Sequence, residues 1–217
     1  MIETGIKFGD IHSFFDLNLI LSAVKIPPAT PKTTYVEVPG ADGSVDLTEA
    51  HGEVRYSDRQ CEFTFTAHPL DATDWEEKKT AVSNALNGRE FNITLDKDDE
   101  FYYVGRCTVK DYNENKKIRK ITVSAKVKPY KYRQLMTVQT INLTSTAKTV
   151  YLHNSRKTLS PTIICSNDNT KIVQGNTEVT LSAGTHKVLD IRLVEGANTL
   201  KVSGSGTVTF EYREAEL

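Results

Sequence analysis

Apolar and polar residues alternate with a period of two along most of the chain, which is typical of β-strands that bury one face. The alternation is clearest in residues 61–67, 103–110 and 121–128. The last two runs have the spacing of a hairpin that turns at residues 113–115. We therefore expect a mainly β protein.

One segment departs from this pattern and predicts an α-helix between about residues 74 and 87. Thr73 and Glu76 have capping-box spacing at its start, and Gly88 stands where a C-terminal cap is expected. Apolar residues gather on one narrow side of this helix, so it should lie on a sheet. That side comprises Trp75, Val82 and Leu86 with Ala85 beside them, and the opposite flank comprises Glu76, Glu77, Lys78 and Lys79.

The alternation breaks at residues 129–135, and the sequence that follows is richer in Thr, Ser and Asn. We place a domain boundary there, with an N-terminal domain at 1–133 and a C-terminal domain at 134–217. The second domain predicts about seven short strands joined by turns, which is typical of a compact β-sandwich. The expected strands span residues 137–143, 148–152, 161–165, 177–181, 186–193, 199–203 and 206–213.

The balance of charge argues against a nucleic-acid partner. The chain has 27 Lys and Arg against 28 Asp and Glu, which leaves a formal charge of −1 and no field that would gather phosphate groups. The first residues lack the basic and apolar regions of a secretion signal, and no apolar run is long enough for a membrane helix. We expect a protein that is made and kept in the cytoplasm.

No group of residues in the sequence predicts catalysis, a cofactor or a metal site. Three scattered cysteines, Cys61, Cys107 and Cys165, fall in alternating runs and are interpreted as small buried apolar residues. The five histidines are too dispersed to form a zinc-binding pair. They stand at positions 12, 51, 68, 153 and 186.

The acidic run at residues 96–100 begins like a calcium-binding loop but fails two requirements of that loop. Phe101 stands at the sixth position, where glycine is needed, and Cys107 stands at the twelfth, where a bidentate glutamate is needed. We interpret the run as a solvated hairpin tip between strands at 91–95 and 101–112.

Residues 115–133 contain eight Lys or Arg and no acidic residue, which is the sharpest charge feature of the chain. Two interpretations remain open. The stripe is either a solvated strand face or a patch that meets an acidic surface on a neighbouring copy, such as the 96–100 run, since complementary patches fix register in symmetric rings. The candidate inter-subunit charge patch comprises Lys116, Lys117, Arg119, Lys120, Lys126 and Lys128.

The most distinctive motif is Pro-Gly-Ala-Asp-Gly-Ser-Val-Asp-Leu-Thr-Glu-Ala at residues 39–50, a turn-rich loop between two strand-like runs. Pro39 cannot donate to a strand ladder, and Gly40 and Gly43 tolerate positive φ angles. Asp42 and Asp46 can hydrogen-bond their own backbone. We therefore expect strand pairing to stop at this loop.

Together with two later segments, this motif resembles the distal tail protein (Dit) family of siphophages and prophages. The first of these segments is Ser-Pro-Thr-Ile at residues 160–163. The second combines Glu-Gly-Ala-Asn-Thr-Leu at 195–200 with the run at 206–214, which closes on Tyr-Arg-Glu. The three segments occur in the family's order, so the resemblance covers nearly the whole chain.

The resemblance implies a fold and a structural function. An N-terminal β domain with one helix and a long hairpin would close into a hexameric ring around an open channel, and a C-terminal galectin-like β-sandwich would project outward. The ring would be a baseplate hub that joins the tail tube protein to the tail-tip protein and the receptor-binding protein, and it would catalyse nothing. DNA would pass through the channel without specific binding, and no membrane partner is implied. The protein would be located in the virion tail tip after assembly in the host cytoplasm.

The residues that match the first motif are candidates for an interaction or ring-shaping loop, although the geometry of the loop alone could also require its Gly and Asp residues. The matching residues are Gly40, Asp42, Gly43, Ser44, Asp46, Leu47, Thr48, Glu49 and Ala50.

A carbohydrate-binding module for attachment to the host surface is the alternative function. Sugar sites on sandwich folds offer exposed aromatic rings, and residues 134–217 contain only Tyr151, Phe210 and Tyr212. The last two alternate with Glu211 and are interpreted as core or strand positions. A cell-wall hydrolase ranks third, because no acid pair or metal cluster supports it.

Overall fold

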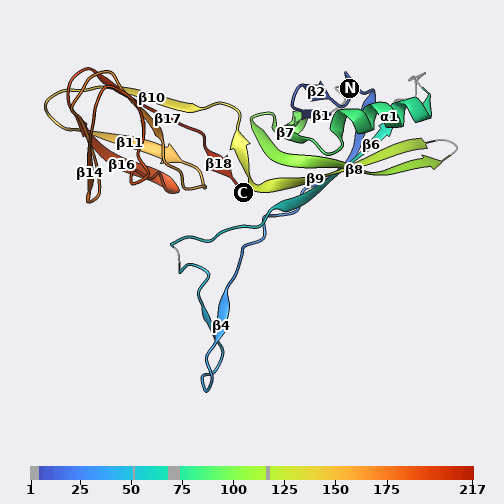
Figure 1. Cartoon of the computed structure of the whole chain (residues 1–217), viewed down its shortest axis with the longest axis horizontal. Helices are drawn as coiled ribbons and strands as arrows, with labels where there is room; N and C mark the ends of the chain where they lie inside the picture. The colour runs from blue at the N-terminus through green and yellow to red at the C-terminus, as the bar shows by residue number, and fades with distance from the viewer. Residues whose placement is uncertain (1–4, 51, 68–73, 116–117) are drawn as a thin grey trace. The chain divides into compact units, whose positions relative to one another are not determined.

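The computed structural model describes residues 5–50, 52–67, 74–115 and 118–217 (Figure 1). Strands dominate, and the part of the chain so described contains one α-helix, which confirms the mainly β prediction. The chain separates into two compact units, Met1–Lys131 together with Leu217, and Tyr132–Glu216.

Most strands of the first unit belong to one sheet. Within the described residues its order is β2-β1-β7-β8-β9-β6-β3. The bounds are β2 (Ile11–His12), β1 (Ile6–Phe8), β7 (Glu90–Leu95), β8 (Phe101–Asn115), β9 (Ile118–Arg133), β6 (Arg59–Ala67) and β3 (Leu19–Lys25).

The β8–β9 hairpin is longer than the sequence pattern predicts. Residues 113–115, expected as the turn, still belong to β8, and the connection at 116–117 lies outside the described residues. The end of β8 is polar on both sides, so no buried face marks it as a strand in the sequence. The acidic run falls between β7 and β8 as expected, where η1 (Asp96–Asp98) forms a single 3-10 turn.

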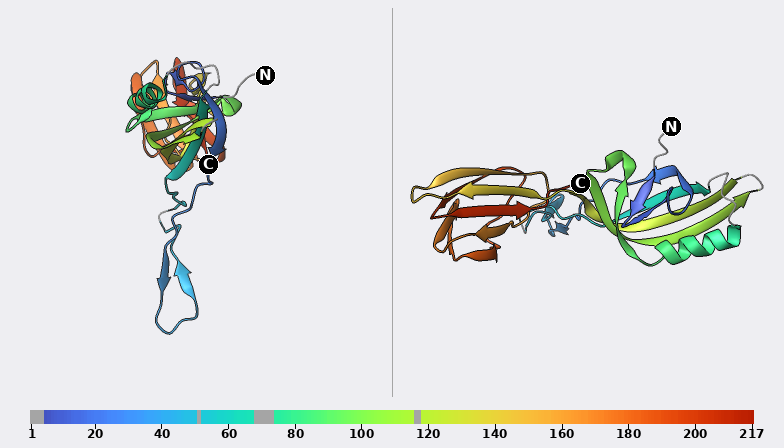
Figure 2. Two further views of the ribbon diagram at one scale, coloured as in Figure 1. Left: turned by 90° about the vertical axis from the view of Figure 1, so that its right-hand side faces the viewer. Right: turned by 90° about the horizontal axis from the view of Figure 1, so that it is seen from above.

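The helix α1 (Trp75–Leu86) lies along one face of this sheet (Figure 2). Asp74 caps its N-terminus by accepting hydrogen bonds from the amides of Glu76 and Glu77 at 2.9 and 3.4 Å. Thr73, the expected cap, lies outside the described residues. Gly88 follows the helix with a φ of 74°, as a C-terminal stop requires.

The buried side of the helix includes one residue that the sequence placed in solvent. Trp75, Val82 and Leu86 are buried as expected, but so is Lys78, at 7% exposure. Its ammonium group donates to the carbonyl of Leu17 at 2.8 Å. The long apolar stem of lysine covers the core while its charged end reaches an acceptor, which a helical pattern alone does not reveal.

The core of the first unit joins the helix to the inner face of the sheet. Phe8 packs edge to face against Phe63 and Phe65, with ring centroids 6.1 and 6.3 Å apart. Cys61 and Cys107 are fully buried in the same core, and Cys165 is buried in that of the second unit. All three are free thiols, which confirms their interpretation as small apolar residues.

The described residues between 30 and 57 leave the sheet and return to it as a long hairpin, here called the arm. Its root is held by hydrogen bonds from the amide of Lys32 to the carbonyl of Arg55 at 2.7 Å, and from the amide of Ser57 to the carbonyl of Thr30 at 2.9 Å. Further out, β4 (Tyr35–Glu37) pairs with β5 (Ser44–Asp46) in a sheet of their own. Figures 1 and 2 show this ribbon standing apart from the sheet of the same unit.

The arm corrects one sequence expectation. Residues 39–50 are not a loop throughout, because Ser44, Val45 and Asp46 form a strand and only residues 38–43 turn the chain. Gly40 and Gly43 have positive φ angles of 79° and 75° at this tip, as their residue type predicts. Pairing therefore resumes inside the motif as soon as the second glycine has reversed the chain.

Residues 132–216 are all described and form two four-stranded antiparallel sheets that share one core. The first has the order β10 (Thr137–Asn142), β17 (Thr207–Tyr212), β12 (Thr162–Cys165) and β15 (Gly184–Lys187). The second has the order β11 (Lys148–Asn154), β16 (Gly196–Ser203), β13 (Thr170–Gln174) and β14 (Thr177–Leu181). Leu152 and Leu200 from one sheet and Ile163 and Phe210 from the other are fully buried in that core.

Two strand predictions in this unit are wrong. β13 is absent from the expected strands, because its polar ends obscure a short apolar centre. The expected strand at 186–193 ends at Lys187 instead. The chain then turns, with the amide of Ile191 bonded to the carbonyl of Val188 at 3.3 Å, and Ile191 and Leu193 are buried from this turn. Ile191 and Leu193 are two positions apart, so their spacing in the sequence resembles the alternation of a strand although they enter the core from a turn.

Candidate functional site

The arm presents an apolar face that no described residue of its own unit covers. Val36 and Val45 are paired across the ladder, and Val38 lies two residues beyond Val36 on the same side. Leu47 joins them, because its amide bonds to the carbonyl of Thr34 at 2.8 Å. These four residues, here called the apolar arm face, are 42–49% exposed. Tyr35, Glu37, Ser44 and Asp46 occupy the opposite face.

The arm is also acidic. Residues 33–50 contain Glu37, Asp42, Asp46 and Glu49 and no Lys or Arg. All four carboxylate residues are exposed. An apolar face beside a cluster of like charges is a surface that favours a basic partner with an apolar centre.

Local geometry accounts for part of the motif. Asp46 accepts a hydrogen bond from the amide of Thr48 at 2.8 Å, and hydrogen bonds from Thr48 lower the pKa of this carboxyl group. The hydroxyl oxygen of Thr48 accepts one from the amide of Thr34 at 3.1 Å. Ala50 closes a turn, its amide bonded to the carbonyl of Leu47 at 3.1 Å. The side chains of Asp42, Ser44 and Glu49 make no hydrogen bond to any other residue that the structure describes, so the loop's own geometry does not explain them.

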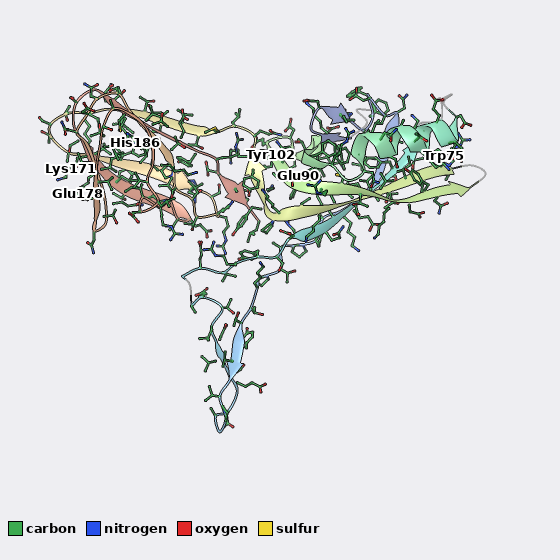
Figure 3. The ribbon with its side chains drawn as sticks, in the orientation of Figure 1. Trp75, Glu90, Tyr102, Lys171, Glu178 and His186 are labelled. Carbon is green, nitrogen blue, oxygen red and sulfur yellow. The ribbon has the colours of Figure 1, made fainter. Side chains whose placement is uncertain are left out.

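The basic stripe divides between the two faces of β9. Lys120, Lys126 and Lys128 alternate along one face, whereas the guanidinium of Arg119 lies 5.6 Å from the ring centroid of Trp75, on the helix side (Trp75 is labelled in Figure 3). Lys116 and Lys117 lie outside the described residues. The structure therefore brings together three of the six predicted patch residues on one strand face and separates Arg119 from them.

Lys126 and Lys128 border a hollow of about 490 Å³ on the outer face of the sheet, here called the polar hollow. Arg106 adds a third cation, while Asp58 and Glu90 contribute two carboxylates (Glu90 is labelled in Figure 3). The Nζ atom of Lys126 lies 3.5 Å from Asp58. The other lining residues are Gln60, Val104, Gly105 and Thr108.

The acidic run is engaged within its own chain, which weakens it as the partner of the basic stripe. Asp98 forms an ion pair with Lys131 at 2.9 Å. Asp96 accepts hydrogen bonds from the amide of Gly5 at 2.5 Å and from Nε2 of His12 at 3.2 Å. His12 and Asp96 are 84 residues apart, so no local sequence signal indicates their contact.

The ring of His12 holds one tautomer through its two nitrogen atoms. Its Nδ1 accepts hydrogen bonds from the amides of Phe14 and Phe15 at 3.1 and 3.3 Å, so the proton of the neutral ring lies on Nε2 and points at Asp96. The imidazole is therefore committed to backbone and carboxylate partners and does not activate a nucleophile.

The closing Tyr-Arg-Glu of the second unit has a structural role. The hydroxyl of Tyr212 donates to the carbonyl of His153 at 2.6 Å, and Arg213 donates to the carbonyl of Arg133 at 2.5 Å. Glu214 accepts from the hydroxyls of Ser155 at 2.6 Å and Thr137 at 3.0 Å. The three residues join the end of β17 to the start of the unit.

Asn198, from the Glu-Gly-Ala-Asn motif, is equally structural. It is 4% exposed, and its side-chain amide donates to the carbonyls of Val194 and Gly196 at 2.8 and 3.1 Å. Its carboxamide oxygen accepts from the amide of Val194 at 2.9 Å. The motif therefore encodes a locked turn before β16, in which Gly196 has a φ of 90°.

The aromatic residues of the second unit differ sharply in exposure. Phe210 and Tyr212 are 0% and 4% exposed, as the sequence predicts, whereas Tyr151 on β11 is 66% exposed. Across the described residues, no cluster of three His, Cys, Asp or Glu could hold a metal ion. In the same residues, no helix has the length and apolar character needed to span a membrane.

Comparison with known proteins gives a structural match but no match in sequence. No protein-family model matches the chain, and no curated protein matches it. The crystal structure of SPP1 Dit (gp 19.1), a protein of a phage that infects Gram-positive bacteria, is similar over 99% of both chains with a TM-score of 0.73. The chain has the Dit fold. The sequences are 15% identical, so the likeness lies in the fold.

The Dit fold confirms, at the level of structure, the family resemblance that the three motifs indicate. Because the match covers 99% of this chain, it extends over both units and does not depend on one of them. The order of strands and helix expected from the resemblance agrees with this result. SPP1 Dit itself is described as a paradigm of the hub adsorption apparatus in phages that infect Gram-positive bacteria.

Proposed function

We propose that this chain is a structural subunit of a phage tail tip. Six copies close into a ring that joins the end of a long non-contractile tail tube to the tail-tip and receptor-binding proteins. The Dit fold and the hub role of SPP1 Dit support the tail-tip assignment. The subunit acts by binding and not by catalysis, and it resides in the virion after assembly in the host cytoplasm.

The observation that carries the self-assembly proposal is the arm. A two-stranded ribbon is marginally stable alone in water, so an apolar face such as that of Val36 and Val45 gains stability when a partner covers it. The occupant that we propose is the next copy of the same chain. Its Lys126 and Lys128 provide the positive charge that complements the acidic arm.

In this arrangement the two surfaces that the sequence analysis singled out, the interaction loop and the basic charge patch, form the two sides of one contact. The residues of the interaction loop, Gly40 to Ala50, lie on the arm of one copy, and the basic residues of β9 lie on its neighbour. The arm replaces the 96–100 run as the acidic partner, because Asp96 and Asp98 are already paired within the chain. A contact between two different patches on identical subunits generates a ring when the rotation from one copy to the next closes.

The native mass of the purified full chain tests this proposal. Light scattering after size exclusion, at several protein and salt concentrations, should give a particle near six times 24.3 kDa that dissociates as salt increases. A monomer at every concentration, including in the presence of the matching tail tube protein, contradicts the ring.

The exposed ring of Tyr151 favours the second candidate, a carbohydrate-binding function of the second unit. It projects from the outer face of β11, opposite Thr199, and exposed tyrosine rings are the surfaces on which sugars stack. Binding of the full chain to a glycan array, lost on Tyr151→Ala, would support this function. Equal binding by the wild type and the variant would exclude this ring as the site.

A further inference from the structure

Arg59 is a buried cation at the point where the arm joins the sheet. It is the first residue of β6 and follows directly on the returning strand of the arm. The side chain is 6% exposed, and its guanidinium lies 5.2 Å from the ring centroid of Tyr103 on β8. Nη1 donates to the carbonyl of Pro27 at 3.4 Å, and Nη2 donates to the carbonyl of Pro129 near the end of β9.

The two acceptors explain why a guanidinium stands here. The pairing of β3 with β6 ends at Lys25 and Glu62, and the pairing of β9 with β6 ends at Val127 and Arg59. The carbonyls of Pro27 and Pro129 therefore lie beyond both ladders of β6 and need a donor other than its backbone amides. One planar guanidinium can serve both carbonyls and still stack on an aromatic ring, which the compact ammonium group of lysine cannot do. Arg59 therefore replaces the backbone ladder where the ladder fails.

The charge of Arg59 is compensated without a carboxylate. Among the described residues its partners are the two carbonyls and the face of Tyr103, and its Nε is buried with no acceptor. Burying a cation in this way is costly, so simple packing would be served better by an apolar side chain. The arrangement is suited to holding three segments in one fixed geometry.

We propose that Arg59 is the positioning residue of the arm. It fixes the outgoing strand at Pro27 and the returning strand at its own backbone against β8 and the end of β9. The direction in which the arm leaves the sheet is thereby set before any partner binds. This inference concerns the isolated chain and does not depend on whether the chain forms a ring.

Hydrogen exchange of the full chain tests the proposal residue by residue. The amides of Lys32 and Ser57, which close the arm root, should exchange about tenfold faster in Arg59→Lys, because the lysine loses part of the charged hydrogen bonding that keeps the root closed. Amides in the centre of β6, around Phe63, should be unchanged. Arg59→Met keeps the apolar stem but has no hydrogen-bond donor, so it should raise the exchange rates of these two amides by at least as much as Arg59→Lys.

Lys110→Gln is the matched control. Lys110 is an exposed cation on the same sheet that pairs with Glu62 of β6 at 3.6 Å and has no part in the proposed contact between copies. The exchange of Lys32 and Ser57 should stay at the wild-type rate in this variant. Unchanged root amides in both Arg59 variants would overturn the proposal. An equal rise in the exchange rates of amides across the whole sheet would also overturn the proposal, because it would show that the substitution lowers the stability of the unit in general.

Discussion

Val36 and Val45 lie directly opposite each other on the arm, and both remain more than two-fifths exposed. Cross-strand valine pairs are common in sheets, where a second layer covers them. Here the pair has no second layer among the residues of its own unit that the structure describes. It is therefore the best point at which to separate a role in assembly from a role in folding.

Replacing Val36 and Val45 by lysine should abolish self-association and leave the subunit folded. The substitutions place charge in the centre of the proposed contact, where desolvation of an unpaired cation weakens binding by roughly 2 kcal/mol or more. The midpoint of thermal unfolding should shift by less than about 2 °C, because neither residue contributes to the core. Light scattering and circular dichroism measure the two effects.

Ser44→Lys is the control for these arm variants. Ser44 lies on the same strand as Val45 but faces the other way, and its side chain makes no hydrogen bond among the described residues. The added lysine reduces the negative charge of the arm but leaves the apolar arm face intact, so Ser44→Lys should weaken self-association less than the two valine substitutions. An equal loss of assembly in Ser44→Lys would assign the effect to the charge of the arm and not to its apolar face.

Reversing the charge of Lys126 and Lys128 should weaken self-association and remove its salt dependence. The acidic arm would then face carboxylates on the neighbouring copy, and like charges in a contact reduce both affinity and association rate. Sedimentation at low and high salt should show a large difference for the wild type and a small one for Lys126→Glu/Lys128→Glu. Lys148→Glu, an exposed position on β11 of the second unit, should behave like the wild type.

Glu214 should stabilise the second unit in a pH-dependent manner. Burial raises the pKa of its carboxyl group, but hydrogen bonds from Ser155 and Thr137 and the charge of Arg133 outweigh burial, so the pKa is lowered overall. A lowered folded-state pKa contributes stability above the unfolded value of 4.5, and this stability is lost as pH falls through the folded-state pKa.

Glu214→Gln should consequently be less stable than the wild type by about 1–2 kcal/mol at pH 7. The difference in the free energy of unfolding should shrink as the pH is lowered from about 5 to 2. This range begins near the unfolded pKa of glutamate and extends through the lowered pKa of the folded state. Urea unfolding at several pH values gives the comparison. A constant difference at every pH would mean that the charge of Glu214 has no part in it.

The native thiols should be unreactive. Burial raises the pKa of Cys61 to about 11 and that of Cys107 to about 12, and it raises the pKa of Cys165 as well. Since the thiolate is the nucleophile, a disulfide reagent at pH 8 should release almost no chromophore from the folded chain. Addition of guanidinium should release three equivalents, and one full equivalent before unfolding would contradict the burial of a cysteine.

Gly105→Ala should destabilise the first unit by roughly 2–4 kcal/mol. A Cβ atom there would lie 2.5 Å from the carbonyl oxygen of Lys126 and 2.6 Å from Cγ1 of Val127. Backbone atoms of a neighbouring strand cannot move aside cheaply. Thr108→Ala, on the same strand but exposed, should change the free energy of unfolding by less than about 0.5 kcal/mol.

The sequence by itself determined the local structure of this protein. The period-two alternation predicts most of the β strands, and the apolar positions with the stop at Gly88 predict α1 to within a residue at each end. The glycines at 40 and 43 predict positive φ angles at the arm tip, and three motifs in order indicate a fold that the structural match confirms. These features depend on neighbours within a few residues, so their signal is present in the chain itself.

Only the tertiary structure decided which distant residues act together. It divides one basic stripe between two faces of β9, buries Lys78 against the carbonyl of Leu17, and joins Arg59 to carbonyls 32 and 70 residues away. It also leaves the apolar arm face without cover from the described residues of its unit. Such contacts depend on how strands pair and on which side of the sheet each side chain falls, and a one-residue change of register would reverse every one of them.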